Sequence, residues 1–440
     1  MDNLVARDDA LIADSLKIRY NPMVIASGQG STVSDMTGRS WLDFGAGWAV
    51  ASLGYSHEGV RRAVQEQLNR TTFAGSISSI NQPAVELAQR LTELMPGKFA
   101  KKAWFGHSGS DANEAAHRLV KAASGRRRII SFVGSWHGMT DQGQAISGHP
   151  AFNQHIGDGH VTKLPYPDPA QNPFGGPPGA VVDQLLAYLE DFLFKTICPP
   201  SDVAAVFVEA LQSDGGDIVP PDDFLPRLRD LCDRHGIYLV VDDVKVGLGR
   251  TGTFYSYEQS SIAADLVVLG KALGGGLPLG AIVGRKEILD AGIGTALFTT
   301  AGSATCCAAG LAVVEAIIDE GLADASREKG QLLQELLRDA LETYPEVAAI
   351  RGRGLIQGVE LVTADGAPNQ PLAAAVVYRA WELGLILYYA GNAANVLELT
   401  PPLVITNEEI ARGVEILARA LDDARSGRVD QEAVARYAGW

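Results

Sequence analysis

Short apolar runs rich in β-branched residues recur along the first two thirds of the chain. They are apolar throughout rather than alternating, and they lie at 103–105, 128–133, 204–210, 237–243, 265–271 and 280–284. Helical stretches such as 223–235 separate them. Strands that are apolar on both faces and alternate with helices are typical of a mostly parallel sheet covered by helices on both sides. The pattern therefore predicts an α/β core.

The last third of the chain follows a different pattern. It predicts a helix, the strand LIQGVELV, a second helix, the strand LILYY and a final helix, with the helices at 326–343, 371–383 and 407–424. This is a smaller α+β unit, which the N-terminal segment joins through short strands around TVSDMTGRSWLDF. The Pro- and Gly-rich stretch 165–180 is expected to be a loop. We expect three regions: an N-terminal segment, a large domain and a C-terminal small domain, at 1–65, 66–320 and 321–440.

Composition narrows the class of protein. A chain of 440 residues, 46% of them hydrophobic, can bury a large core. Its net charge of −15 repels phosphate backbones, so we expect no nucleic-acid partner. The N-terminus is charged where a signal peptide would be apolar, and no run of about 18 apolar residues occurs, so we expect neither secretion nor a membrane span. Four cysteines without a CxxC pair indicate neither disulfides nor a metal site and favour a reducing, cytoplasmic location.

Polar residues that directly follow an apolar strand are the first candidates for function, because ligands of open α/β sheets bind outside the carboxyl ends of the strands. The strand IYLVV ends in Asp242 and Asp243, a pair of carboxylates that we expect to face a cleft. The strand DLVVLG precedes Lys271, which the glycine-rich segment ALGGGLPLGA follows. Taken alone, the carboxylates are as readily a cap on the next turn, and the lysine is as readily solvated.

A third candidate is the start of a helix, where Ser108, Gly109 and Ser110 follow a strand. Small residues there leave backbone N–H groups free to bind a phosphate, although a plain serine N-cap explains Ser108 alone. Together the three groups suit an apolar cofactor that has a phosphate, a ring nitrogen kept protonated by a carboxylate, and an aldehyde that forms an imine with a lysine. A nucleotide-binding P-loop does not compete, because Ala272 follows the lysine where the motif GxxxxGK[ST] requires Ser or Thr.

Five segments occur in order along the chain: WFGHSGSDANEAA, FVGSWHGMT, VFVEALQSDGG, VVDDVKVGLGRTG and LGKALGGGLPLGA. They resemble the class III, ornithine-aminotransferase-like branch of the fold type I enzymes that use pyridoxal 5′-phosphate (PLP), and the resemblance extends from about Asn21 to Ile405. It implies a large domain whose mostly parallel seven-stranded sheet lies between helices, and a smaller α+β domain. It also implies a homodimer with shared active sites, in which Thr299, or alternatively Thr300, reaches a phosphate across the interface.

The resemblance also assigns roles at the cofactor. Lys271 is implied to form the Schiff base with PLP, and Asp242 to pair with the pyridine nitrogen. Trp136 and Val244 are implied to cover the two faces of the ring, with His137 structural beside them. The phosphate is implied to bind at the start of the helix, at Ser108, Gly109 and Ser110.

Three residues differ from those usual in the motifs of this branch, and they change the expected substrate. Lys245 stands where these aminotransferases usually have glutamine, and Asp214 where they have glutamate. Glu398 stands where many have an arginine that binds the substrate carboxylate, so a free α-carboxylate would meet an anion. A neutral amide, a lactam or a cationic amine suits such a pocket better. Alternatively, Glu398 points to solvent or pairs with a local arginine.

Two further segments are GAGWAVASLGYSH, around Trp48, and the terminal YAGW. Together with the three differences, they make the sequence similar to those of α-amino-ε-caprolactam racemases and amino acid amide racemases. The similarity implies that Lys271 removes the α-proton and that a second group returns one to the opposite face, for which Asp214 is the candidate and Lys245 its tuning partner. Trp48 and Glu398 are then substrate residues. An aminotransferase or an aminomutase would share the first steps, and a PLP-sensing regulatory domain is the non-enzymatic alternative.

Overall fold

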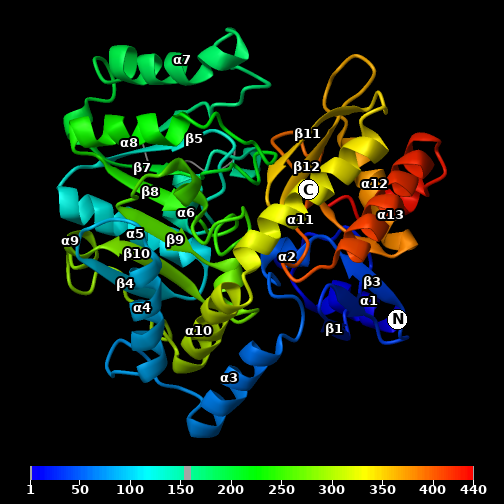
Figure 1. The fold of residues 1–440 in the computed structure, drawn as a ribbon, viewed down its shortest axis with the longest axis horizontal. Helices are drawn as coiled ribbons and strands as arrows, with labels where there is room; N and C mark the ends of the chain where they lie inside the picture. The colour runs from blue at the N-terminus through cyan, green and yellow to red at the C-terminus, as the bar shows by residue number, and fades with distance from the viewer. Residues whose placement is uncertain (1, 153–159, 440) are drawn as a thin grey trace.

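The computed structural model describes residues 2–152 and 160–439, which form a larger and a smaller part (Figure 1). The larger part contains a seven-stranded sheet in the order β4-β10-β9-β8-β7-β5-β6. Strand β10 runs antiparallel to both of its neighbours, and the remaining strands run parallel to one another, as the pattern predicts. The strands are β4 (Lys101–Gly106), β5 (Arg128–Phe132), β6 (Val161–Leu164), β7 (Val203–Val208), β8 (Tyr238–Asp242), β9 (Leu266–Leu269) and β10 (Gly280–Arg285).

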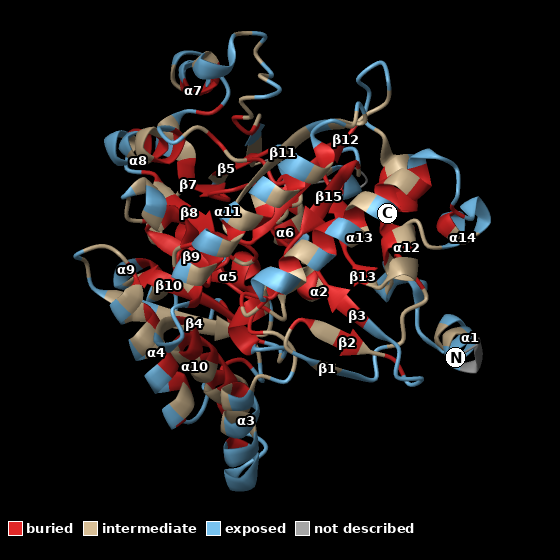
Figure 2. Ribbon diagram, turned by 45° about the vertical axis from the view of Figure 1, so that its right-hand side comes forward, coloured by how far each residue is buried: buried red, intermediate tan, exposed pale blue. Residues whose placement is uncertain are grey.

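Successive residues of these strands pack into apolar clusters on opposite faces of the sheet. Val240 and Val268 pack with residues of α5 (Gly109–Ser124), whereas Val241 and Leu269 belong to the cluster that includes α4, α8 and α10. Side chains alternate across a strand, so a strand that is apolar throughout needs cover on both faces. Figure 2 shows the result as red strands enclosed by helices with pale blue outer faces. The covering helices on the second face are α4 (Gln82–Leu94), α8 (Phe224–His235) and α10 (Ala304–Asp319).

The smaller part joins segments from the two ends of the chain. One sheet has the order β1-β2-β3-β13 and the other β11-β12-β15-β14. The expected strand LILYY divides between them, because Leu385 of β13 pairs parallel with Leu42 of β3, and β14 pairs with β15 after the intervening Leu387. This pairing brings N- and C-terminal elements together on one side of Figure 1. The strands are β1 (Ser27–Gln29), β2 (Thr32–Ser34), β3 (Ser40–Asp43), β11 (Val347–Arg353), β12 (Ile356–Leu361), β13 (Leu385–Ile386), β14 (Tyr388–Ala390) and β15 (Val396–Leu399).

Among the described residues, three helices cover these small sheets. The small sheets pack against α11 (Leu322–Leu341), α12 (Gln370–Leu383) and α13 (Asn407–Arg425). The long helix α11 crosses the middle of the view in Figure 1. Outside these elements lie α1 (Asp2–Leu11), α2 (Ala46–Ala49), α3 (Glu58–Arg70), α6 (Asp141–Ile146), α7 (Val181–Ala187), α9 (Lys286–Leu289) and α14 (Gln431–Arg436).

Two features differ from the sequence expectation. The apolar pattern does not predict β6, because this edge strand has only four residues and two of them are Thr162 and Lys163. Helix α11 begins at Leu322 rather than at 326, directly after Gly321, whose φ of 62° is the left-handed conformation that glycine favours. The stretch 165–180 is a loop that ends in the short 3₁₀ turn η3 (Pro178–Ala180). The domain boundaries at 65 and 320 stay a prediction.

Some expectations concern what the chain lacks. None of the helices in the described ranges is both long and apolar enough to span a bilayer. Residues 2–152 and 160–439 contain no group of three or more His, Cys, Asp or Glu side chains suited to a metal ion. The cysteines Cys198, Cys232, Cys306 and Cys307 are free thiols. Trp440, the end of YAGW, lies outside the described residues.

Candidate active site

A cavity of about 350 Å³ lies at the carboxyl ends of β4, β8 and β9. These strands run parallel, so the segments that follow them meet at the same edge of the sheet. A larger cavity of about 550 Å³ lies beside α1 and contains none of the residues predicted to hold the cofactor. The 350 Å³ cavity brings together most of those residues: Ser108, Gly109, Ser110, Trp136, His137, Asp242, Val244 and Lys271.

The helix start at one end of the cavity is built to accept an anion. Ser108 caps α5, and its Oγ accepts a hydrogen bond from the backbone N–H of Asp111 at 3.3 Å. The first N–H groups of a helix have no partner within it and carry the positive end of the helix dipole. A Cβ at position 109 would lie 2.6 Å from Val244 Cγ1, so only glycine lets this turn pack against the loop after β8. The serine N-cap and the phosphate cradle are therefore compatible rather than alternative interpretations.

The carboxylate of Asp242 is held rigidly at the other end of the cavity. Its Oδ2 accepts hydrogen bonds from Asn113 Nδ2 and from His137 Nδ1, each at 2.7 Å, and its Oδ1 accepts one from the backbone N–H of Val244 at 3.0 Å. Asp242 and His137 are buried. Donors directed at both oxygens fix the orientation of this carboxylate. His137 thus holds the Asp242 carboxylate in place, and its structural role beside a bound cofactor stays a prediction.

Asn113 is a residue that the sequence reasoning missed. It lies in the motif HSGSDANEAA, of which only the first residues were assigned a role, and it faces the end of β8 from within α5. An asparagine is a poor interior residue for a helix, and this one is only 1% exposed among buried alanines. A buried amide in an apolar stretch of helix is the signal that could have identified it.

Asp243 does not share the role of its neighbour, so the expectation of a carboxylate pair facing the cleft is wrong. Its carboxylate accepts hydrogen bonds from the backbone N–H and the hydroxyl of Ser256, on the opposite side of the chain. Consecutive residues at a strand end point to opposite faces, which separates the two side chains. Burial raises the pKa of Asp243 to about 7.

Lys271 follows β9 directly and lines the cavity. A Cβ at the preceding position 270 would lie 2.9 Å from the backbone nitrogen of Gly109, so glycine there lets the end of β9 approach the start of α5. The backbone of Lys271 has a positive φ of 44°, a strained conformation for a side chain other than glycine. Burial lowers the pKa of Lys271, the negative charge of Asp214 opposes that shift, and the positive charge of Lys245 adds to it. A lowered pKa favours the neutral amine, which is the nucleophilic and basic form.

Trp136 and Val244 line the cavity from two different loops. Trp136 is half-buried and packs on Phe152, with 4.6 Å between the ring centroids, and on His149 at 5.5 Å. These contacts hold the indole in place beside the cavity. That Trp136 and Val244 cover the two faces of a ring stays a prediction.

Beside the cavity, Lys245 forms a buried ion cluster with two carboxylates. Its Nζ lies 2.5 Å from Glu398 Oε1 and 3.5 Å from Asp214 Oδ1, and 5.1 Å from the ring centre of Trp48. Burial alone would lower the pKa of Lys245, but the charges of Asp214 and Glu398 reverse this, so the pKa is raised and the lysine stays an ammonium. Burial tends to raise the pKa of Asp214, but the charges of Lys245 and Lys271 outweigh it and lower the pKa.

Glu398 is fully buried on β15 and bonds to Lys245. It neither points to solvent nor pairs with an arginine, so both of those alternatives are wrong. Burial raises the pKa of Glu398 and Lys245 opposes the shift. The repulsion expected between Glu398 and a substrate carboxylate is reduced, because its charge is matched by an ammonium at 2.5 Å.

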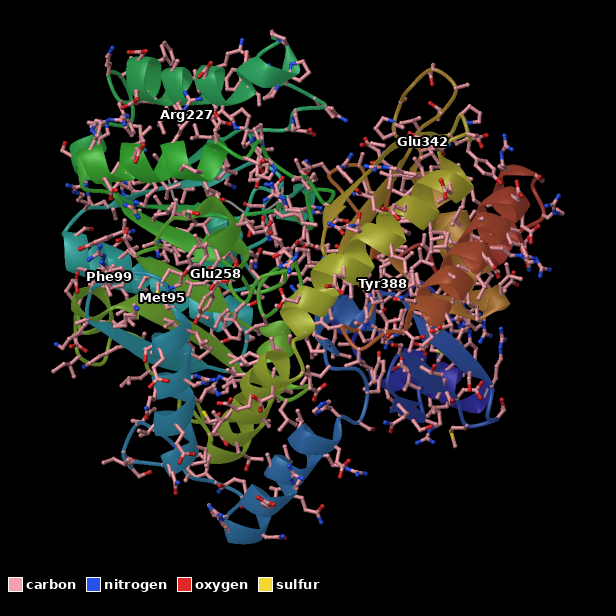
Figure 3. All side chains as sticks on the ribbon, in the orientation of Figure 1. Met95, Phe99, Arg227, Glu258, Glu342 and Tyr388 are labelled. Atoms are coloured by element: carbon pink, nitrogen blue, oxygen red, sulfur yellow. The ribbon has the colours of Figure 1, made fainter. Side chains whose placement is uncertain are left out.

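Trp48 occupies an unusual turn next to this cluster. Ala46, Gly47, Trp48 and Ala49 all have positive φ values, between 45° and 62°, and form one left-handed turn. Such a turn costs roughly 1–2 kcal/mol for each residue other than glycine. The Trp48 ring stacks on Tyr388, labelled in Figure 3, with 4.6 Å between centroids, and presents a face to Lys245. The strained turn thus places an aromatic ring against the ion cluster.

Replacing Lys245 by methionine is expected to destabilise the protein by about 3–5 kcal/mol, because it leaves two buried carboxylates without a cation. The double variant Lys245→Met/Glu398→Gln should recover most of this loss, since it removes one of those charges. Denaturant unfolding of the wild type, both single variants and the double variant measures the coupling. Lys195→Met, which breaks the exposed pair with Asp191, is the control and should cost under about 0.5 kcal/mol. A cost for Lys245→Met as small as that of the control would contradict the ion cluster.

The two candidate threonines behave differently in the single chain. A hydrogen bond of 2.7 Å joins Thr300 Oγ1 to His107 Nε2, so Thr300 already has a partner within its own subunit. Both threonines are exposed. Which of them contacts a phosphate across a subunit interface stays a prediction.

The cavity thus brings together the start of α5, the buried carboxylate of Asp242 and the buried amine of Lys271. The chain belongs to the class-III aminotransferase family: the sequence profile described as "Aminotransferase class-III" matches residues 16–421. It is similar in structure to the ω-transaminase of Pseudomonas jessenii in complex with PMP, with a TM-score of 0.86 and 29% identity over 92% of this chain and 93% of that one. The family uses PLP, and the residues around the cavity fit that cofactor.

The relatives with known activities fall into two groups. The chain is 34% identical to an alanine/serine racemase of Pyrococcus horikoshii, over 98% of this chain and 92% of the relative. It is 34% identical to a leucine/methionine racemase of Thermococcus litoralis, over 100% and 99%. It is also 36% identical to a 5-aminovalerate aminotransferase of Pseudomonas putida, over 91% and 93%. The protein is therefore a PLP-dependent enzyme of this family whose relatives include both amino acid racemases and aminotransferases.

Proposed function

We propose that the protein is a PLP-dependent racemase that inverts the α-carbon of α-amino acid amides or of α-amino-ε-caprolactam. The observation that carries the proposal is the buried cluster in which Lys245 holds the carboxylate of Asp214 beside Lys271. Racemisation needs an acid/base group on each face of the α-carbon, and these two side chains are the pair that the site offers. The names of two similar relatives, an alanine/serine racemase and a leucine/methionine racemase, support the same class of reaction.

The cavity has few groups for a free α-carboxylate. None of the described residues that line it is an arginine, the side chain best suited to hold a carboxylate. The cation added next to the cavity, Lys245, is already shared by Asp214 and Glu398, so the cluster carries more negative than positive charge. These charges favour a neutral amide or lactam over a free amino acid.

In this proposal the chain's own side chains divide the work. The start of α5 binds the phosphate of PLP, Lys271 attaches the cofactor, and Asp242 keeps the ring nitrogen protonated. When bound, PLP supplies an electron sink for the pair released at the α-carbon. Lys271 takes the α-proton on one face, and Asp214 exchanges a proton on the other. Lys245 holds Asp214 in the anionic form that accepts a proton.

The proposed activity should show itself without a keto acid. An L-amino acid amide or L-α-amino-ε-caprolactam incubated with the holoenzyme in heavy water is expected to lose optical rotation and to gain deuterium at the α-carbon. A panel of amides, lactams and free amino acids, read by chiral chromatography with and without a keto acid, tests substrate and reaction together. The alternative, an aminotransferase, is favoured by the 5-aminovalerate aminotransferase among the relatives, and turnover that depends on a keto acid would establish it. An aminomutase would move the amino group, and PLP binding without turnover of any amine would indicate a regulatory domain.

Replacing Asp214 by asparagine is expected to lower racemisation by about 10²- to 10⁴-fold, because the amide cannot exchange a proton. Exchange of the α-proton on the Lys271 face of one enantiomer should persist, so deuterium enters that enantiomer without inversion. Asp222→Asn, at an exposed position bonded to Arg353, is the control and should behave as wild type. Unchanged interconversion of both enantiomers in Asp214→Asn would exclude this residue as the second acid/base.

The proposal includes a cytoplasmic homodimer. Apolar side chains near Thr299 are strongly exposed in the single chain, among them Ile80 at 91% and Ile293 at 103% of full exposure, with Phe73, Ile77 and Leu297 around them. Exposed apolar side chains on neighbouring segments are typical of a surface that another subunit covers. Light scattering of the holoenzyme is expected to give about twice the chain mass of 46.6 kDa, and the mass of one chain would contradict the shared site.

A further inference from the structure

We propose that Asp217 is a positioning residue of this site: its carboxyl group shares one proton with Glu398 and thereby holds Glu398, and through it Lys245, in place beside Asp214. Its catalytic consequence rests on the function proposed for Asp214, whereas the shared proton can be tested without any substrate. Asp217 is the third acidic residue of the cluster and is absent from the sequence assignments.

The first observation is that both carboxyl groups are buried and incompletely bonded. Asp217 and Glu398 are each 0% exposed. Neither oxygen of Asp217 has a hydrogen-bond partner among the described residues, and in the same ranges Glu398 Oε2 has none, because Lys245 takes only Oε1. Buried polar atoms without partners are rare and costly. A single proton between the two carboxyl groups would give both residues a partner.

The second observation is that the strands make room for this arrangement. Gly358 of β12 lies opposite Glu398 of β15 in the ladder. A Cβ at position 358 would lie 2.9 Å from Asp217 Oδ2, so the carboxyl group of Asp217 occupies the space that a side chain there would fill. The backbone N–H of Asp217 donates to Ser213 O at 2.9 Å, and its φ of 52° closes the turn. The same turn carries Asp214, so both acids are fixed by one short segment.

The charges around Asp217 favour the neutral form. The groups acting on it are Glu398 on β15, Lys245 after β8, Arg351 on β11 and Asp214 on its own turn. Burial is the largest effect and raises the pKa of Asp217, Glu398 and Asp214 raise it further, and Lys245 and Arg351 lower it without reversing the shift. Two adjacent buried carboxyl groups cannot both ionise cheaply, so they hold one proton between them.

This arrangement changes the role of Glu398. With Oε1 accepting from Lys245 and Oε2 from Asp217, both oxygens of the buried Glu398 side chain are directed at protein groups. Glu398 serves to hold Lys245. A substrate would contact the remaining N–H donors of Lys245 and the carboxylate of Asp214. The substrate role assigned to Glu398 from its sequence position is therefore indirect.

Infrared difference spectroscopy of the folded holoenzyme tests the shared proton. At neutral pH, wild type minus Asp217→Asn should show the C=O band of a protonated carboxyl group, and Glu398→Gln should shift that band. Asp222→Asn should show no such band, because its carboxylate is exposed and pairs with Arg353. No protonated-carboxyl band in the Asp217→Asn difference would overturn the proposal.

The pH dependence of stability gives a second test. The pKa of Asp217 is raised above its ordinary value, near 3.8, in the folded protein. Above that pH the unfolded chain releases this proton and the folded protein keeps it, so folding takes up a proton. The contribution of Asp217 to the stability of the wild type therefore falls as pH rises. Asparagine cannot ionise, and the excess of the apparent Tm of Asp217→Asn over wild type should therefore grow from about pH 5 to pH 8. Relief of backbone strain at φ 52° would give an excess that does not change with pH. A constant or shrinking excess would overturn the proposal.

Turnover separates a positioning role from a purely structural one. Asparagine keeps a donor for Glu398, so Asp217→Asn should retain kcat within about threefold, whereas Asp217→Ala, which lacks the donor, should lose about 10- to 100-fold in kcat with little change in KM. Equal turnover of the two variants would contradict the positioning role. If the infrared and stability tests succeed while no racemisation occurs in any variant, the proposed function fails and the shared proton stands.

Discussion

Lys271→Ala is expected to lower turnover of every amine substrate by at least about 10⁴-fold, because one change removes both the attachment point of PLP and the base on one face of the α-carbon. The structure places Lys271 directly after β9, in the same cavity as the start of α5 and the carboxylate of Asp242. The variant should also bind PLP reversibly, so that dialysis removes the cofactor and its visible absorption. Turnover, measured as racemisation and as α-deuterium incorporation, and cofactor retention are the two readouts.

The control for this variant is Lys286→Ala, which removes a lysine bonded to Asp290 on the surface. It should retain PLP and full turnover. Lys271→Arg keeps a cation of similar length but cannot form the covalent link, so it should fail like Lys271→Ala. If Lys271→Ala retained appreciable turnover, the lysine would not be the reactive group and the reading of the cavity would be wrong.

The sequence predicts the large sheet well because the information is local. Runs such as IYLVV and DLVVLG are apolar on both faces, so their burial and the ends at which Asp242 and Lys271 emerge follow from the pattern itself. The edge strand β6 has no such pattern, since an edge needs less apolar surface. The division of LILYY between two sheets depends on pairing with β3, more than 300 residues earlier in the chain, which local periodicity cannot show.

A site residue can be predicted from the sequence when its own position in the chain identifies it. It is harder to predict when its role depends on a network of contacts. Asp242 and Lys271 follow from their positions at strand ends, but Asn113 and Asp217 matter only through partners distant in sequence. The pairing of Glu398 with Lys245 joins residues 153 positions apart, and no spacing rule predicts it. Asp243 does not join Asp242 at the cavity, because strand alternation turns its side chain toward Ser256.

Asp242→Asn is expected to lower turnover by about 10²- to 10³-fold, the usual cost of losing one preorganised electrostatic partner in a buried site. The amide carries no charge to keep a ring nitrogen protonated. The amide NH2 must also take the place of one carboxylate oxygen. In either orientation it then faces a donor, which is Val244 N–H on one side and Asn113 and His137 on the other. Weaker PLP binding should accompany the loss of turnover, measured by titration of the apoenzyme with PLP.

The neighbouring residue provides a matched comparison for this prediction. Asp243 is the same residue type, equally buried and on the same strand end, but its carboxylate faces Ser256 instead of the cavity. Asp243→Asn should therefore lower the melting temperature, because it disturbs buried hydrogen bonds, while turnover per folded molecule and the affinity for PLP stay within about threefold of wild type. Since a general effect of removing a buried charge would act on both variants alike, a difference confined to Asp242 assigns the effect to its position at the cofactor. Equal losses of turnover in the two variants would show that the strand end as a whole, and not the Asp242 carboxylate, supports the chemistry.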